Sequence, residues 1–155
     1  MADLFETKAI CEDMLGEIAE LERLCFSLPW SETSLRILCS EGGVGFAVCD
    51  TESGRAVAYG GMLTVLDEAQ ITNIAVHPDY RRIGLGKRIL RRLLGCCGER
   101  GITSCSLEVR ESNSAARALY SGEGFSEVGR RKNFYSAPRE DAVIMIWKRE
   151  DTPSA

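Results

Sequence analysis

The clearest pattern along the chain is an apolar stripe with helical spacing in its second half. The stripe consists of aliphatic residues and one cysteine that recur every three or four positions: Leu85, Ile89, Leu90, Leu93, Leu94 and Cys97. This spacing predicts an amphipathic helix from about 85 to 100 that stops at Gly101. Gly95 and Gly98 lie inside it, where glycine lowers helix stability. We expect these two glycines to allow close packing of the helix on a sheet.

A second apolar stripe and several β-branched runs predict the remaining elements. Met14, Ile18, Leu21 and Cys25 share one face of a helix over about 12–25. Ser31 is typical of an N-cap for a short helix ending near Cys39, and Ser112 or Asn113 should cap a helix reaching about Ser121. Strands are predicted at 4–8, 45–50, 55–66, 68–76, 104–109, 125–134 and 143–148, with a turn at 51–54.

This order of helices and strands predicts a single-domain α/β fold with a mixed, mostly antiparallel sheet covered by helices on both faces. The domain should span residues 1–150, and a short polar tail follows at 151–155. A chain of 155 residues is long enough for one domain with an adequate core.

Composition and charge exclude several classes of protein. No apolar run approaches the ~20 residues of a membrane-spanning helix, and residues 1–8 do not form a signal peptide. The net charge of −4 argues against a nucleic-acid surface and would suit a basic peptide partner.

The seven cysteines form no CxxC pair, and the chain has one histidine. We therefore expect no metal site and reduced thiols in a cytoplasmic protein. Cys96 and Cys97 could form a redox pair, although adjacent cysteines rarely reach good disulfide geometry. The single histidine, His77, precedes Pro78 in a turn, and a structural or solvent-facing role is favoured over a catalytic one.

The segment from Arg81 to Lys87 (RRIGLGK) has the features of a phosphate-binding turn. It follows a β-branched run, contains two glycines and opens the predicted helix at 85. Free N–H groups and the helix dipole favour an anion at such a helix start. A P-loop would need glycine at position 81, and a dinucleotide fingerprint would need a small residue at position 89. Neither condition is met, and a basic turn that caps a solvated helix is the simpler alternative.

Six further blocks, in order along the chain, identify the family that this turn resembles. They are LPWSE at 28–32, VLDEA at 65–69, NIAV at 73–76, LEVR at 107–110, SN with ALY at 112–120, and REDA at 139–142. Together with RxxGxG they resemble the GCN5-related N-acetyltransferases, and among them the bacterial group that acetylates ribosomal proteins on alanine. The resemblance runs from about Pro29 to Met145.

The resemblance implies acetyl-CoA as cosubstrate and a set of residues that bind it. The pyrophosphate would lie on Arg82, Ile83, Gly84, Leu85, Gly86 and Lys87. Main-chain groups of Ile74, Ala75 and Val76 would bind the pantetheine arm and polarise the thioester carbonyl, and Asn113 matches a further CoA contact. From the residues alone, the side chains of 74–76 could equally be core, and Asn113 could be only an N-cap.

Glu108 and Tyr120 are the candidate catalytic residues. The amine must lose a proton to attack the thioester, and Glu108 alternates with apolar neighbours near the carboxyl end of a strand. The resemblance implies a proton relay through water to Glu108. Tyr120 would donate a hydrogen bond or proton to the leaving thiolate, a transfer uphill by roughly 2 kcal/mol for an ordinary phenol. The alternatives are a salt-bridged strand glutamate and a tyrosine that packs its helix on the sheet.

Leu28, Trp30, Phe134 and Tyr135 are candidates for an apolar groove that binds the acceptor. Trp30 could instead belong to the core. Phe134 stands where relatives often carry tyrosine, so one hydroxyl of the family is missing. The sequence thus predicts an enzyme that acetylates a protein N-terminus, with the N-terminal alanine of a small-subunit ribosomal protein as the expected acceptor. Acetylation of lysine or of a small amine, or CoA binding without catalysis, are the alternatives.

Overall fold

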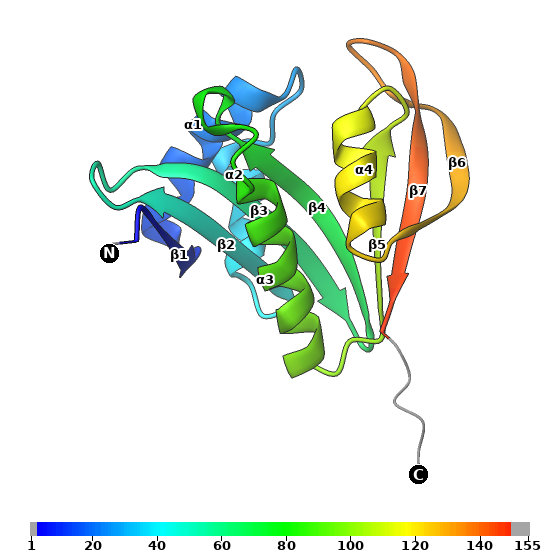
Figure 1. Ribbon diagram of the computed structural model, residues 1–155, viewed down its shortest axis with the longest axis horizontal. Helices are drawn as coiled ribbons and strands as arrows, with labels where there is room; N and C mark the ends of the chain where they lie inside the picture. The colour runs from blue at the N-terminus through cyan, green and yellow to red at the C-terminus, as the bar shows by residue number, and fades with distance from the viewer. Residues whose placement is uncertain (1–2, 150–155) are drawn as a thin grey trace.

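A seven-stranded mixed sheet with helices on both faces forms the molecule (Figure 1), and the predicted fold class is confirmed. The computed structural model describes residues 3–149, so the predicted tail at 151–155 lies outside the described residues. The strands are β1 (Phe5–Ala9), β2 (Gly43–Asp50), β3 (Ala56–Val65), β4 (Glu68–Val76), β5 (Ser104–Arg110), β6 (Ser126–Tyr135) and β7 (Glu140–Lys148). Their order in the sheet is β1-β2-β3-β4-β5-β7-β6, and β4–β5 is the parallel pair.

The helices lie close to where the apolar stripes predict them. The α-helices are α1 (Leu15–Cys25), α2 (Glu32–Leu35), α3 (Leu85–Glu99) and α4 (Ser114–Gly122), and the 3-10 helices are η1 (Glu12–Met14), η2 (Arg36–Cys39) and η3 (Pro78–Tyr80). The Ser31 side chain accepts a hydrogen bond from the Ser34 N–H at 3.1 Å, and Asn113 accepts one from the Ala116 N–H at 3.1 Å. Both predicted N-caps are therefore confirmed, and Asn113 is the one that caps α4.

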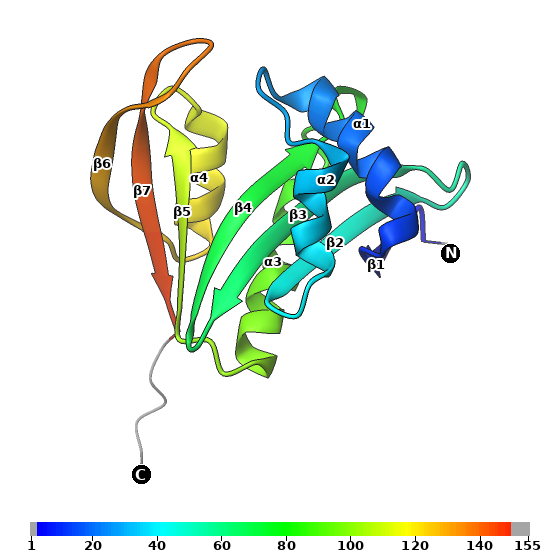
Figure 2. The same ribbon diagram turned by 180° about the vertical axis from the view of Figure 1, so that it is seen from behind.

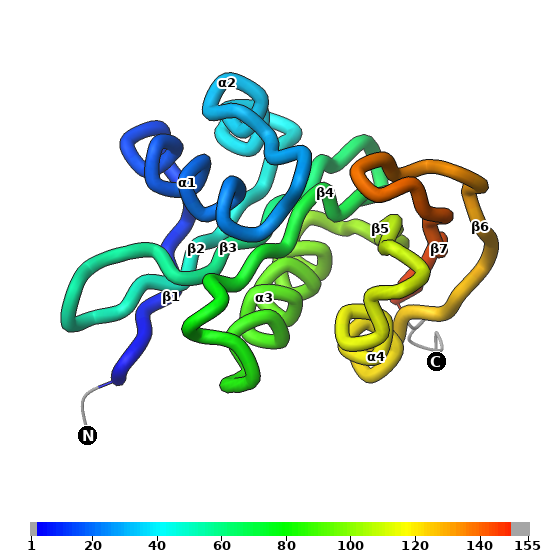
Figure 3. The backbone as a smooth tube through the Cα atoms, turned by 90° about the horizontal axis from the view of Figure 1, so that it is seen from above, coloured from blue at the N-terminus to red at the C-terminus, as the bar shows by residue number. Residues whose placement is uncertain are grey.

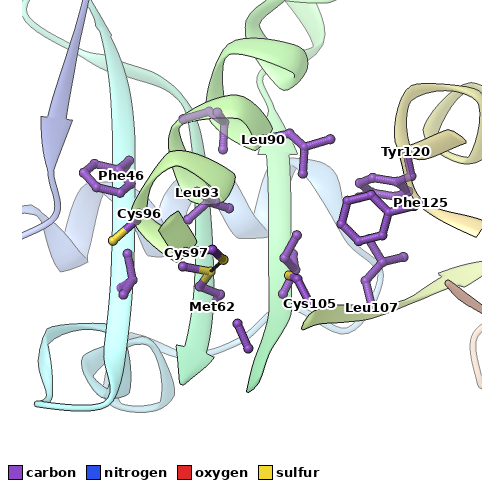
Figure 4. Close-up of a cluster of buried hydrophobic side chains, with 14 of the residues drawn as sticks. Phe46, Met62, Leu90, Leu93, Cys96, Cys97, Cys105, Leu107, Tyr120 and Phe125 are labelled. Atoms are coloured by element: carbon purple, nitrogen blue, oxygen red, sulfur yellow. Dashed lines mark hydrogen bonds between the residues drawn. The ribbon is translucent and has the colours of Figure 1, made fainter. Parts of the chain in front are cut away.

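Two apolar cores lie on opposite faces of the sheet. Helices α1 and α2 cover one face of the sheet, and α3 and α4 lie on the other (Figures 2 and 3). The core under α3 and α4 contains Leu90 and Leu93 of α3, together with Met62, Leu107 and Tyr120 (Figure 4). The core under α1 and α2 is smaller and is built on Leu15, Ile18, Leu35 and Tyr59.

Close packing of α3 on the sheet depends on a glycine of β3, and the expectation for the two α3 glycines is wrong. Gly95 and Gly98 are exposed, and a Cβ at Gly98 would meet no atom within 4 Å. A Cβ at Gly60 of β3 would instead lie 2.3 Å from Cγ2 of Ile89. The absence of a side chain at Gly60 is therefore what brings the helix onto the sheet.

Strands β4 and β5 separate after a short contact, and this separation positions the site. Their pairing runs only from Glu68 with Ser104 to Gln70 with Ser106. Beyond it the strands diverge (Figure 1), so the β5-facing edge of β4 from Ile71 onwards has no strand partner.

A β-bulge at Thr72 changes the direction of the side chains along this free part of β4. Gly61 pairs with Asn73 whereas Met62 pairs with Ile71, which leaves Thr72 as the extra residue. After the bulge, Ile74 packs against the core under α3 and Ala75 lies in the core under α1. Asn73, which follows the bulge directly, is turned toward α1.

None of the described helices is long and apolar enough to cross a membrane. All seven cysteines have free thiols, so Cys96 and Cys97 form no disulfide. His77 caps η3 by accepting a hydrogen bond from the Asp79 N–H at 3.1 Å, and its ring packs edge-on against Tyr80. The structural interpretation of this histidine is therefore confirmed.

Candidate active site

A cleft of about 530 Å³ opens where β4 and β5 diverge. Eight of the sixteen predicted site residues line it, from four elements and two loops: Leu28, Trp30, Ile74, Glu108, Asn113, Tyr120, Phe134 and Tyr135. Both predicted catalytic residues and all four predicted groove residues therefore lie around one cavity. Ala75, Val76 and the segment 82–87 do not line it.

Glu108 lies on the β5 wall of the cleft. Its side chain is 16% exposed, and its Oε1 lies 3.2 Å from Nε of Arg131 on β6. No described residue donates a hydrogen bond to Oε2 of Glu108. One carboxylate oxygen is therefore held by a cation, and the other is available to a water or an amine.

Two phenols lie on the same side of the cleft as Glu108. Tyr120 of α4 is 8% exposed and packs against Phe125, and burial raises its pKa to about 12. Tyr135 at the end of β6 also has its pKa raised to about 12, first by burial and then by the Glu108 carboxylate. Both phenols therefore keep their protons throughout the neutral and moderately alkaline range.

The segment after Tyr135 is held against the cleft by Arg110 of β5. Its guanidinium donates to the carbonyls of Ser136 at 3.0 Å and Pro138 at 2.8 Å, and it lies 4.5 Å from the Tyr135 ring centroid. Because Arg110 is only two residues from Glu108 on the same strand, it fixes this wall relative to the candidate base.

The predicted phosphate turn lies beside the cleft at the N-terminus of α3. Gly84 has φ +88° and Arg82 has φ +65°. The first hydrogen bond of α3 runs from the Arg88 N–H to the Gly84 carbonyl, and within residues 3–149 the N–H groups of 83–87 have no acceptor. A Cβ at Gly86 would lie 3.4 Å from Leu119 of α4 and 3.8 Å from Val76 of β4. The turn is thus wedged between the two elements that flank the cleft.

The charged side chains of the turn are not all directed at a ligand. Lys87 Nζ lies 3.8 Å from a Glu123 oxygen of the α4 C-cap. Arg81 donates from Nε to the Val76 carbonyl at 3.0 Å, so this main-chain group has a partner within the protein. The free N–H groups, rather than the side chains, are the part of the turn best suited to hold a phosphate.

Two buried polar residues of the cleft wall were not predicted from the sequence. Glu22 of α1 is 1% exposed, and Asn73 of β4 is 9% exposed. A signal for Glu22 was present, because it follows Ile18 by four residues and so lies on the apolar face of its helix. For Asn73 the only signal was one amide within an apolar strand.

Comparison with known proteins identifies the family. Residues 15–125 match the sequence model of the acetyltransferase (GNAT) family. The chain therefore belongs to the GNAT family, and it is an N-acetyltransferase.

Individual relatives show which N-acetyltransferases the chain is similar to. The chain is 42% identical over 127 residues to "[Ribosomal protein bS18]-alanine N-acetyltransferase" of Escherichia coli K12, covering 81% of this chain and 84% of that protein. It is 36% identical over 141 residues to the enzyme of the same name from Haemophilus ducreyi, covering 89% and 96% of the two chains. The crystal structure of the E. coli ribosomal-protein-S18-alanine N-acetyltransferase superposes with a TM-score of 0.88 at 35% identity, over 96% of each chain. The NatC complex bound to Gag peptide and CoA shares the fold, with a TM-score of 0.83 at 22% identity, over 96% of this chain and 100% of the matched one.

Proposed function

We propose that this enzyme transfers the acetyl group of acetyl-CoA to the N-terminal α-amine of a protein, specifically the N-terminal alanine of ribosomal protein bS18. The observation that carries this proposal is the cleft at the β4–β5 divergence. A carboxylate and two protonated phenols line this cleft together with the predicted groove residues, and a phosphate-type helix start lies against α4 and β4, which contribute to its walls. Relatives that share 36–42% identity with the chain are named for this reaction.

The residues fit acetyl-CoA at both ends of the proposed site. The free N–H groups of 83–87 and the dipole of α3 suit the pyrophosphate. The unpaired edge of β4, including main-chain groups of Ile74, suits an extended arm that carries amide groups. The side-chain oxygen of Asn113 already caps α4, so we assign Asn113 only a secondary contact with CoA.

Glu108 would accept the proton of the attacking amine. An α-amine with a pKa of ~7.8 is neutral in roughly a tenth of molecules at pH 7, whereas a lysine with a pKa of ~10.4 is neutral in fewer than about one in a thousand. A glutamate acting directly or through one water therefore suffices for an N-terminus. The open Oε2 is the atom that would take this proton.

Tyr120 would donate a hydrogen bond to the departing thiolate. Complete proton transfer from a phenol with a pKa of about 12 to a thiolate with a pKa of ~8.5 is uphill by about 5 kcal/mol. This is more than the roughly 2 kcal/mol expected for an ordinary phenol. Hydrogen-bond donation, with the final proton taken from solvent, is the role that this burial supports.

The acceptor panel that tests the proposal contains three peptides. One has the N-terminal sequence of bS18 with a free alanine amine, one is the same peptide with a blocked N-terminus, and the third is blocked and carries one lysine. We expect acetylation of the free peptide alone, with the acetyl group located on the α-nitrogen by mass spectrometry. Faster acetylation of the blocked lysine peptide would overturn the proposal.

A further inference from the structure

A buried carboxylate on the α1 side of the cleft has no role in the mechanism above. Glu22 is 1% exposed, and within residues 3–149 no cationic side chain lies within ion-pair distance of it. Burying an ion without a cation costs several kcal/mol unless hydrogen bonds compensate. The partners of Glu22 therefore indicate what the charge is used for.

Three donors from three separate segments converge on Glu22. Its Oε1 accepts from the Tyr59 hydroxyl of β3 and from Nδ2 of Asn73 of β4, the latter at 3.0 Å. Its Oε2 accepts from the backbone N–H of Trp30 at 2.9 Å. We call Glu22, Tyr59 and Asn73 with the Trp30 N–H the Glu22 network.

The bond to Trp30 is the part of this network that reaches the acceptor groove. Residues 27–30 connect α1 to the Ser31 cap of α2 and carry two groove candidates, Leu28 and Trp30. In the described part of the chain, the Trp30–Glu22 bond is the only hydrogen bond made by residues 27–30. Leu28 is 61% exposed, whereas the half-buried Trp30 side chain packs against the core under α1 and α2. The carboxylate is therefore the polar group that fixes the main chain of this segment at the cleft, in addition to the packing of Trp30.

Stability alone is a poor explanation for the Glu22 network. Replacing buried ionic groups with apolar side chains of similar volume is often neutral or stabilising. The network is also incomplete, because Oδ1 of Asn73 is buried without a partner, which is itself unfavourable. A buried carboxylate whose Oε2 holds the main chain of a cleft segment is better explained by positioning.

We propose that Glu22 is a positioning residue of the acceptor site. It holds residues 27–30 against the cleft and thereby limits the space for the side chain of the acceptor's first residue, which favours a small residue such as alanine. This inference rests on the proposed function, because it concerns the acceptor of that same reaction.

The test compares Glu22→Met with Tyr59→Phe. Glu22→Met removes the bond to Trp30, whereas Tyr59→Phe removes a bond to the same carboxylate and leaves Trp30 held. Each enzyme is assayed below its melting temperature with peptides that differ only in their first residue, alanine or leucine. Loss of a hydrogen bond to a charged group corresponds to a change of about 10-fold or more in an equilibrium constant, here that for binding the acceptor.

We expect Glu22→Met to raise the KM for the alanine peptide about 10-fold and to reduce the preference for alanine over leucine about 10-fold. The KM for acetyl-CoA should change less than about twofold, and Tyr59→Phe should keep the native acceptor KM and preference. If Glu22→Met does not fold, the double variant Glu22→Met with Tyr59→Phe is used instead, because it also removes the Tyr59 hydroxyl that would otherwise be left without an acceptor. This double variant is compared with Tyr59→Phe alone.

A folded Glu22 variant with native acceptor KM and native preference would overturn the inference. Equal losses in Glu22→Met and Tyr59→Phe, or a matching rise in the KM for acetyl-CoA, would also overturn it. These results leave the proposed function intact. If the wild-type enzyme instead acetylates only the blocked lysine peptide, the proposed function fails and this inference fails with it.

Discussion

At the scale of single residues, the first test concerns Glu108 as the base that accepts the proton of the attacking amine. Glu108→Gln keeps the shape of the side chain and removes its ability to take a proton. We expect turnover to fall about 10²-fold near pH 7. The loss should shrink as pH rises past ~7.8, because a neutral α-amine no longer needs a base. A pH–rate series from 6.5 to 10 measures this.

Glu111→Gln is the matched control for this series. Glu111 follows β5 directly and pairs with Arg130, but it does not line the cleft. The control should show the native pH profile. A Glu108→Gln defect of equal size at every pH would mean that Glu108 positions the substrate and that the base lies elsewhere.

Tyr120 gives a contrasting pH dependence. Burial raises its pKa to about 12, so the hydroxyl keeps its proton below that pH and loses it only above. Tyr120→Phe should therefore lower kcat about 10²-fold. The size of this loss should be the same at every pH from 7 to 10. Melting should barely move, since the ring still packs against Phe125. A phenylalanine variant with native turnover would leave Tyr120 a packing residue.

Helix caps such as Ser31 were predictable from local sequence patterns, whereas the catalytic side chains were predictable only where the resemblance named them. Glu108 and Tyr120 stand in recognisable blocks, and both line the cleft. Glu22, Asn73 and Arg131 come from α1, β4 and β6, and their contacts with the site join residues far apart in the chain. Local patterns carry no information about such pairings.

At the scale of elements, the helix start at Gly84 is the proposed anion site. Gly84→Asp should weaken acetyl-CoA binding strongly, because it places a carboxylate where the pyrophosphate would lie. Gly84→Asn is nearly the same size and accepts the left-handed φ of +88° about as well, so it isolates the effect of charge. Calorimetry should show much weaker binding for aspartate than for asparagine. Equal affinities in the two folded variants would remove the phosphate site.

Glycine substitutions on the exposed face of α3 and in the strand beneath its buried face should have opposite effects on stability. Gly95 is exposed within the helix, so Gly95→Ala should raise the free energy of unfolding by up to about 1 kcal/mol, or roughly 2–4 °C in Tm. Gly60→Ala places a methyl 2.3 Å from Ile89 and should destabilise by about 1–3 kcal/mol. Thermal melting of both variants checks the pair, and a stable Gly60→Ala would contradict the packing described for α3.

Elements with strong periodicity were predicted to within a few residues. The stripe from Leu85 to Cys97 gave α3, and Ser31 marked the start of α2. The bulge at Thr72 and the separation of β4 from β5 were not predicted. Both depend on which strands pair and for how long, and strand pairing is a long-range property that alternation within one strand does not specify.

At the scale of the whole molecule, three register pairs between β4 and β5 connect two groups of strands. Strands β1 to β4 form one group and β5 to β7 form the other. Beyond these pairs, the core under α3 and α4 joins the two groups, because it contains Met62 of the first group and Leu107 of the second. The mixed topology thus provides a cavity in the middle of the molecule without a second domain.

The unpaired edge of β4 has a consequence for what can occupy the cleft. A sheet interrupted in its interior presents two facing strand edges, as if one short strand had been left out. An extended ligand with amide groups at peptide-like spacing could take the place of that strand and hydrogen-bond to the backbone of β4 regardless of side-chain identity. Such a binding mode would leave the side chains of β4 free to vary, and Asn73 would then be constrained by its contact with α1 rather than by the ligand.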